Sequence, residues 1–199
     1  MQPFHTLTAC AVPLDRVNVD TDQIIPKQFL KRIERSGYGE FLFYDWRNES
    51  NFVLNEPRYA GAQILIAGKN FGCGSSREHA AWALADYGFR VVIAPTFADI
   101  FFSNAGKNGI VLARLTEDEV ALLMSRAATQ PGYQLTVSLA EQRVTDAQGF
   151  SAGFEIDPFR KYCLMEGLDD IGLTLRHSAA LDAYETMHDH AHWLSPRAS

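Results

Sequence analysis

The sequence predicts an α/β fold in which a mixed sheet is flanked by helices, and two patterns carry this prediction. Three apolar runs predict buried strands: residues 64–67, 90–94 and 110–113. Helical patterns lie between them at residues 77–87 and 97–105. Strands that alternate with helices favour parallel pairing through right-handed crossovers. Further on, short apolar or alternating runs indicate a meander of strands: residues 134–139, 143–145 and 153–156.

The composition is that of an ordinary globular protein. The chain has 199 residues, of which 47% are apolar and 21% charged, enough to bury one good core. The net charge of −6 and the lack of a basic cluster argue against nucleic-acid binding. No apolar run approaches the roughly 20 residues of a membrane span. The N-terminus lacks a signal-peptide pattern, so we expect a cytoplasmic protein with no membrane contact.

The first 60 residues predict a strand followed by loops. In order, they contain an apolar patch at 7–12, a polar loop at 15–22, a basic glycine-ended segment at 28–39, an aromatic cluster at 41–46 and a polar loop at 48–58. An aromatic cluster of this density belongs to a core or an interface. On their charge alone, Lys31 and Arg32 in the basic segment would belong to a solvated helix face.

Helices are also predicted in the last third of the chain. Thr116 and Glu119 have capping-box spacing and open a helix to about residue 128. Asp157 and Pro158 start another, which Gly167 ends. The tail at 178–193 has helical periodicity and contains three histidines, but packing on the domain or on a partner explains it better than metal binding does.

The stretch 70–80 is the strongest candidate for a functional site. A buried strand precedes it, Gly72 and Gly74 allow a sharp turn, and a helix follows. Ser75 and Glu78 have S-x-x-E spacing, which predicts Ser75 as the helix N-cap. A helix N-terminus together with Arg77 and two hydroxyls forms a site for a carboxylate or phosphate. The alternative is that Ser75 only caps the helix and Arg77 lies in a surface ion pair.

Other known loops of this kind do not match. The stretch lacks the third glycine of a dinucleotide-binding turn, because Arg77 stands in its place. No Gly-Lys-Ser/Thr follows, so it is not a P-loop, and no glycine stands where a G-x-S-x-G nucleophile elbow needs one. An anion-binding turn with a serine close enough to move a proton remains.

Three motifs resemble one known family. Residues 72–80 (GCGSSREHA) resemble the G-x-G-S-S-R-E-H-A signature of the aconitase superfamily. Residues 20–31 (DTDQIIPKQFLK) and 167–175 (GLDDIGLTL) resemble motifs of the small subunits of bacterial 3-isopropylmalate dehydratases. The resemblance covers residues 17–193. It implies the aconitase C-terminal swivel-domain fold, with 1–199 as one domain and a C-terminal helical extension at about 157–194.

The resemblance also implies an activity and roles for residues. The family isomerises 2-isopropylmalate and 3-isopropylmalate by dehydration and rehydration, a step of leucine biosynthesis. Ser75 would be the base that removes the proton from carbon. The substrate, a small dicarboxylate, would be bound by Ser76, Arg77, Asp22, Lys31 and Arg32. Supporting roles would fall to Gly72, Gly74, Glu78, His79 and Thr21. The alternative for Asp22 is the N-cap of the turn near residue 24.

The cofactor is expected on another chain. Cys10, Cys73 and Cys163 are far apart and no C-x-x-C occurs, so the spacing supports neither a metal nor an iron–sulfur site. The resemblance implies a 4Fe-4S cluster on a large subunit, whose iron would activate the hydroxyl leaving group. This chain would then be half of an active site in a heterodimer or heterotetramer. Cys73 is either near the substrate or simply a small residue in a tight turn.

Two other functions stay open at this point. The chain could belong to a related split hydro-lyase that acts on homoaconitate, citraconate or dimethylmalate, a choice that the segment 28–39 would decide. It could also be a non-catalytic carboxylate-binding module, although the intact Ser75, Ser76 and Arg77 argue against this.

Overall fold

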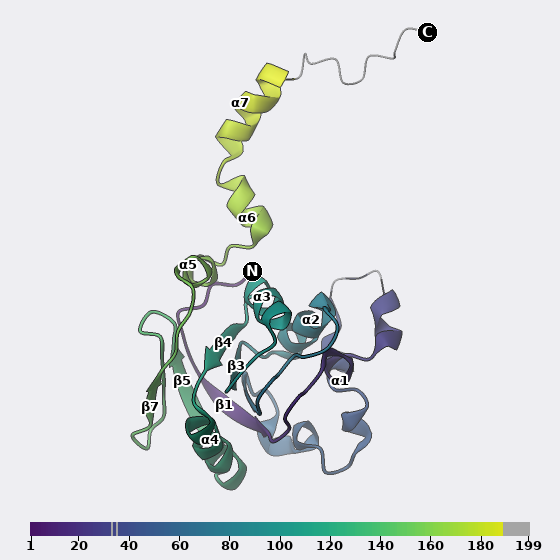
Figure 1. The fold of residues 1–199 in the computed structure, drawn as a ribbon, viewed down its shortest axis with the longest axis vertical. Helices are drawn as coiled ribbons and strands as arrows, with labels where there is room; N and C mark the ends of the chain where they lie inside the picture. The colour runs from purple at the N-terminus through teal and green to yellow at the C-terminus, as the bar shows by residue number, and fades with distance from the viewer. Residues whose placement is uncertain (33, 35, 189–199) are drawn as a thin grey trace.

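The structure is a computed structural model that describes residues 1–32, 34 and 36–188. It contains a seven-stranded sheet in the order β4-β3-β2-β1-β5-β6-β7 (Figure 1). The strands are β1 (Thr6–Leu14), β2 (Ile64–Ala67), β3 (Val91–Ala94), β4 (Val111–Arg114), β5 (Gln134–Ser138), β6 (Arg143–Thr145) and β7 (Ser151–Gly153). β1 to β4 are parallel, and β5 to β7 form an antiparallel meander. The predicted mixed α/β sheet is therefore confirmed.

β1 joins the two halves of the sheet. Its first half pairs with β5 in antiparallel register, from Thr6 opposite Ser138 to Cys10 opposite Gln134. Its second half, from Ala11 to Leu14, pairs with β2 in parallel. The strand is longer than the predicted patch at 7–12, because Thr6 at its start also pairs with β5, and Pro13 and Leu14 at its end also pair with β2.

One predicted strand was misplaced. The third strand of the meander is β7, not residues 153–156, and Gly153 is its last residue. β7 pairs with β6 only from Ser151 to Gly153. Beyond it, the N–H of Phe154 donates to the carbonyl of Gln142, and the chain then leaves the sheet toward the next helix.

Helices cover both faces of the sheet, and the sheet separates the core into two clusters. They are α1 (Thr21–Ile24), α2 (Glu78–Tyr87), α3 (Asp99–Lys107), α4 (Glu117–Thr129), α5 (Pro158–Glu166), α6 (Asp170–Leu175) and α7 (Ser178–His188). α2 and α3 lie on one face, where they bury Leu65 and Val92. α4 lies on the other, against Ile66 and Val91. The predicted capping box of Thr116 and Glu119 opens α4 and is confirmed.

Short 3-10 turns build the connection between β1 and β2. They span Lys27–Lys31, Gly39–Phe41, Trp46–Asn48, Val53–Asn55 and Pro57–Tyr59. The aromatic cluster lies in this connection, and its Phe43 is fully buried and stacks on Trp46 at 5.3 Å between ring centroids. The prediction of a core role is confirmed for this residue.

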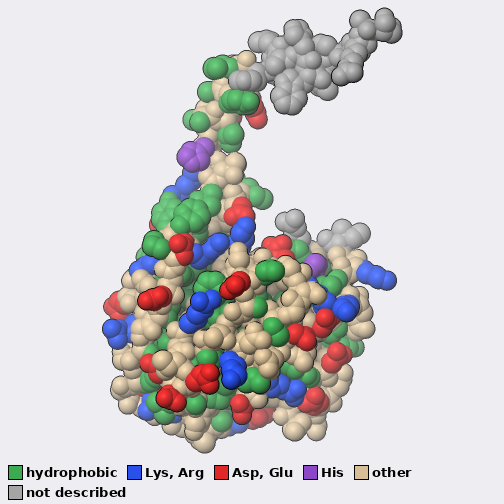
Figure 2. Space-filling view, viewed as in Figure 1, with side chains coloured by type: hydrophobic (Ala, Val, Ile, Leu, Met, Phe, Trp, Pro, Cys, Tyr) green, Lys and Arg blue, Asp and Glu red, His purple; other side chains and the backbone are tan. Residues whose placement is uncertain are grey.

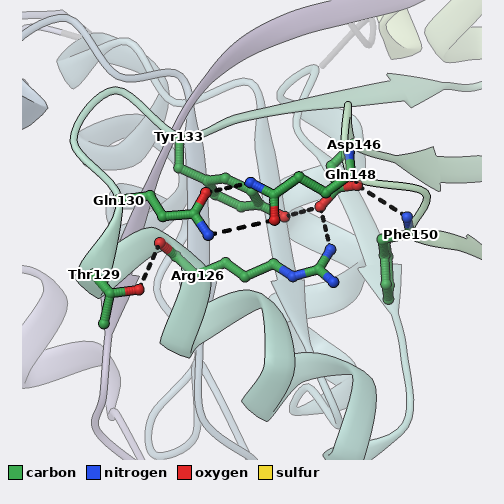
Figure 3. Close-up of polar contacts among 7 residues, drawn as sticks. All are labelled: Arg126, Thr129, Gln130, Tyr133, Asp146, Gln148 and Phe150. Carbon is green, nitrogen blue, oxygen red and sulfur yellow. Dashed lines mark hydrogen bonds and ion pairs between the residues drawn. The ribbon is translucent and has the colours of Figure 1, made fainter.

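A buried carboxylate fastens the meander to α4 (Figure 3). Asp146 accepts hydrogen bonds from Arg126 Nη1 at 2.5 Å and from the Tyr133 hydroxyl at 2.6 Å. It also accepts the backbone N–H groups of Gln148 and Phe150. Burial alone would raise the pKa of Asp146, but these donors outweigh burial and lower it.

The C-terminal helices leave the body of the protein. Asp157 caps α5 and Gly167 ends it in a left-handed conformation, as predicted. α6 and α7 then extend away from the sheet (Figure 1), and every residue from 174 to 187 is exposed. The predicted tail helix at 178–193 is confirmed as far as His188, whereas His190 and His192 lie outside the described residues. Within the described part of the chain, no helix is long and apolar enough to cross a membrane.

Candidate active site

Two of the sequence motifs meet at the carboxyl ends of β1 and β2. The carbonyl of Val19 accepts the N–H groups of Gly72 at 2.7 Å and Cys73 at 3.2 Å. The N–H of Thr21 donates to the carbonyl of Cys73 at 2.9 Å, and the Thr21 hydroxyl donates to the carbonyl of Ser75 at 2.8 Å. Thr21 is only 2% exposed. The motif after β1 therefore holds the signature turn in shape, and ligands commonly bind at this edge of an α/β sheet.

Gly72 is required at its position for two reasons. Its φ is +78°, which disfavours residues with a side chain. A Cβ at this position would stand 2.2 Å from Cγ of Phe101 in α3. Gly74 also has a positive φ, of +86°. The turn can therefore lie directly against α3.

Arg77 is held in place by the first motif. Its side chain is 8% exposed, and Nη1 donates to Asp22 Oδ1 at 2.6 Å. The same nitrogen lies 3.4 Å from the carbonyl oxygen of Ile25. The alternative of a surface ion pair is wrong for Arg77, since the guanidinium is buried. Asp22 is not an N-cap either, because Asp20 caps α1 in a capping box with Gln23.

Ser75 does not cap α2, so that prediction was wrong. The helix begins at Glu78, its N-cap residue is the extended Arg77, and it has no side-chain cap. The carbonyl of Ser75 is instead bound by Thr21, which keeps the serine in the turn before the helix. Both Ser75 and Ser76 are exposed. Their hydroxyls are thus available to a ligand beside an uncapped helix N-terminus, which favours negative charge.

A cavity of about 250 Å³ lies at this turn. It is lined by Thr21, Gly72, Gly74, Ser75, Ser76, Arg77 and residues 98–101 at the start of α3. Complete pockets for small ligands commonly measure about 300–1,000 Å³. The cavity lies just below this range.

The start of α3 was missed in the sequence as part of this site. The carbonyl of Phe71 accepts the N–H of Ala98, and that of Thr96 accepts the N–H of Phe71, so the loop after β3 lies beside the signature turn. Asp99 and Ile100 consequently line the cavity. The position of these residues after a parallel strand was the signal that could have found them.

Glu78 and His79 point away from the cavity. Glu78 Oε1 accepts from Asn108 at the end of α3, at 3.3 Å, and therefore ties the two helices together. His79 packs against the rings of Tyr38 at 5.3 Å and Trp82 at 4.6 Å. Burial lowers the pKa of His79.

Lys31 and Arg32 do not line the cavity. Lys31 is exposed at the end of a 3-10 turn. The guanidinium of Arg32 lies 5.0 Å from the ring centre of Phe41 and pairs with Glu40 at 3.3 Å and Glu34 at 3.6 Å. The structure thus separates these two basic residues from the serines.

The cysteines do not form a set of metal ligands. Cys10 lies in β1 and the buried Cys163 in α5, far from the turn in the fold. Cys73 Sγ donates to the carbonyl of Asn18 at 3.3 Å. Burial, and then Asp20, raise the pKa of the Cys73 thiol. Among the described residues, no group of three or more His, Cys, Asp or Glu side chains could hold a metal ion, so these residues do not fit an iron–sulfur cluster.

The fold and the turn together define a class of protein. The family model for the aconitase C-terminal domain matches residues 1–118, which include both motifs of the cavity. Two further models match parts of the remainder: LeuD_N at residues 121–158, and the C-terminal domain of the 3-isopropylmalate dehydratase small subunit at residues 170–197. The chain is thus an aconitase-type swivel domain with an added C-terminal part.

Sequence relatives identify the family within this class. The chain is 69% identical to the 3-isopropylmalate dehydratase small subunit of Acidobacterium capsulatum, over 99% of this chain and 96% of the relative. It is 59% identical to that of Magnetococcus marinus (94% and 95%) and 58% identical to that of Brevibacillus brevis (93% and 98%). The chain belongs to the family of 3-isopropylmalate dehydratase small subunits.

A solved structure supports the fold. The 3-isopropylmalate dehydratase of Methanocaldococcus jannaschii superposes with a TM-score of 0.68 at 22% identity, covering 90% of this chain and 99% of that one. The swivel-domain fold that the motifs predicted is therefore confirmed.

Proposed function

We propose that this chain supplies half of the active site that interconverts 2-isopropylmalate and 3-isopropylmalate, and that a large subunit supplies the other half. The observation that carries the proposal is the cavity in which two exposed serines meet the buried, anchored Arg77. The relatives' name, which is that of a small subunit, supports a site completed by a second chain. The 4Fe-4S cluster, which would act as a Lewis acid on the departing hydroxyl, belongs on that large subunit in our proposal.

In this proposal Arg77 and Ser76 bind the substrate. A guanidinium grips a carboxylate through two parallel hydrogen bonds, and one nitrogen of Arg77 already faces Asp22. The Ser76 hydroxyl donates a further hydrogen bond. Asp22 acts as a positioning residue, because its contact is with Arg77 and not with the cavity. Thr21, Gly72 and Gly74 support the turn.

Ser75 is proposed as the base. Its Oγ takes the proton from one substrate carbon while the hydroxyl leaves the neighbouring carbon. When water adds back, its oxygen bonds to the carbon that lost the proton, and Oγ returns a proton to the carbon that lost the hydroxyl. A serine alkoxide is unfavourable in water, but a nearby guanidinium and the positive end of α2 stabilise its charge. Lys31 and Arg32 are proposed to approach the substrate only when the large subunit is bound, since neither lines the cavity of the chain alone.

The test is dehydratase activity of the chain with a cluster-loaded large subunit under anaerobic conditions. The absorbance of the unsaturated intermediate measures turnover of 3-isopropylmalate. We expect activity only in the mixture, and its loss in Ser75→Ala by about 100-fold or more, the usual contribution of a general base. Ser138→Ala is a matched control on β5, away from the cavity. Near-normal turnover in Ser75→Ala would disprove the role of Ser75, and no activity in a verified mixture would disprove the substrate.

A further inference from the structure

The C-terminal arm, defined as α6 and α7, carries an apolar stripe that is open to solvent. The stripe consists of Ile171 (66% exposed), Leu175 (62%), Leu181 (40%) and Met187 (76%). Ile171 and Leu175 are four residues apart and share one side of α6. Figure 2 shows such hydrophobic side chains along the arm, outside the body of the protein. With about 3.6 residues per turn, Asp182 and Thr186 lie on the side of α7 opposite the midline between Leu181 and Met187.

Helices this short need a surface to pack on. α6 has 6 residues and α7 has 11. Isolated helices shorter than about 12–15 residues are marginal in water, and most helices in proteins are stabilised by packing of an apolar face. The body does not supply that packing for α7, because every residue from 174 to 187 is exposed. The arm is therefore built to be covered by another molecule.

The root of the arm is fixed to the body. Lys107 at the end of α3 pairs with Asp170 at 2.8 Å, and Arg176 pairs with Glu166 of α5 at 3.0 Å. α5, which the arm contacts through Glu166, also carries an exposed apolar side chain, Phe159, at 58%. The arm thus leaves the body at a defined place.

That place is close to the candidate active site. The first residues of α3 line the cavity, whereas its last residue, Lys107, holds the arm. A helix of 9 residues spans roughly 13 Å at about 1.5 Å per residue. A chain that closes the cavity therefore lies within one helix length of the arm's root.

We infer that the apolar stripe of the arm docks on the large subunit of the dehydratase, an inference that rests on the proposed function. The aconitase C-terminal model ends at residue 118, whereas residues 170–197 match the model described as the C-terminal domain of the 3-isopropylmalate dehydratase small subunit. A swivel domain that is a separate chain needs a non-covalent attachment to the subunit that completes its cavity. The root of the arm lies within one helix length of that cavity, and the side of α7 opposite the stripe is polar.

The test measures the affinity of full-length variants for the cluster-loaded large subunit by titration on an immobilised partner. Leu181→Asp places one charge in the stripe, and we expect its dissociation constant to rise by about tenfold or more, as for buried anchors at an interface. Thr186→Asp adds the same charge to the opposite face of α7 and should change the constant by less than about twofold. At saturating large subunit, the stripe variant should recover the parent's kcat, because the cavity is unchanged.

Two outcomes would overturn the inference. The first is equal affinity of the stripe variant and the Thr186→Asp control. The second is a parent chain that self-associates through the stripe, measured by light scattering, while the large subunit binds all variants equally. Failure of the proposed function looks different. A parent that binds the large subunit through the stripe but does not convert 3-isopropylmalate would refute the activity and keep the docking surface.

Discussion

Replacing Asp22 by asparagine tests how Arg77 is held in the site. The substitution keeps the shape of the side chain and removes its charge. Asp22 Oδ1 accepts from Arg77 Nη1 at 2.6 Å, the short distance of a charge-assisted hydrogen bond. The guanidinium is 8% exposed, so in Asp22→Asn a buried cation would face a neutral amide oxygen in place of a carboxylate, with the more distant carbonyl of Ile25 as a further acceptor.

The size of the effect follows from burial. Hydrogen bonds to charged groups contribute about 1.5–3 kcal/mol. The Asp22 side chain is 43% exposed, and solvent screening reduces that value. We therefore expect Asp22→Asn to lower the free energy of unfolding by about 1–2 kcal/mol, a drop of roughly 2–8 °C in Tm for a chain of this length.

Activity should change in a characteristic way. If Asp22 orients Arg77 for a substrate carboxylate, Asp22→Asn raises KM by about tenfold, because 1.4 kcal/mol of binding corresponds to a factor of 10. The kcat should change less, and Asp22→Glu should restore part of the affinity.

A neighbouring ion pair provides the control. Lys27 Nζ lies 3.9 Å from Asp22 Oδ2 and is largely exposed, so Lys27→Gln should alter stability by less than about 0.5 kcal/mol. Thermal unfolding and steady-state kinetics with saturating large subunit measure both effects. If Asp22→Asn matched the Lys27→Gln variant in both Tm and KM, the pair would not position Arg77 and the argument would be refuted.

Two further substitutions probe the scaffold. Gly72→Ala should lower the free energy of unfolding in urea by about 2–4 kcal/mol, because its Cβ would overlap Phe101. Gly61 has a similar φ of +74° and nothing within 4 Å of its Cβ position, so Gly61→Ala should lower the free energy of unfolding by only about 1 kcal/mol. Equal losses in the two variants would show that the contact with Phe101 is unimportant. Asp146→Asn should destabilise the fold by about 2–3 kcal/mol through the lost charge opposite Arg126. The folded-state pKa of Asp146 is lowered, so its contribution is present above about pH 4, its unfolded pKa, and is lost as pH falls through the folded value. The stability difference between parent and Asp146→Asn should therefore shrink on acidification, and a difference independent of pH would contradict this.

The regular elements were predictable because their signals are local. The runs at 64–67, 90–94 and 110–113 contain buried residues on both faces, the pattern of parallel strands covered by helices. The capping box before α4 was recognised because cap and helix are adjacent in sequence. The signature turn was recognised for its glycines, serines and arginine, and the structure gathers these around one cavity.

The predictions that failed concerned features set by contacts between residues far apart in the sequence. The S-x-x-E spacing at Ser75 has the form of a cap, but Thr21 binds the carbonyl of Ser75 and fixes a different turn. Nothing local shows that α3 lies against Gly72, or that Arg77 is paired with Asp22 and buried. The separation of Arg32 from the cavity also follows from its contacts with Glu40 and nearby rings, not from its place in a basic segment.

The two halves of β1 find their partner strands at different times during synthesis of the protein. Its second half finds a parallel neighbour once β2 has been made, but its first half pairs with β5, where Thr6 stands opposite Ser138. Ribosomes add about 5–20 residues per second, so the first half of β1 remains without its partner for roughly ten seconds in the growing chain. An unpaired strand edge is a template for association with other chains. Fragments that end before residue 134 should therefore aggregate. Chains that extend beyond β5 should aggregate less, because β5 then pairs with the open edge of β1. The meander thus covers a strand edge in the half of the protein that carries the site.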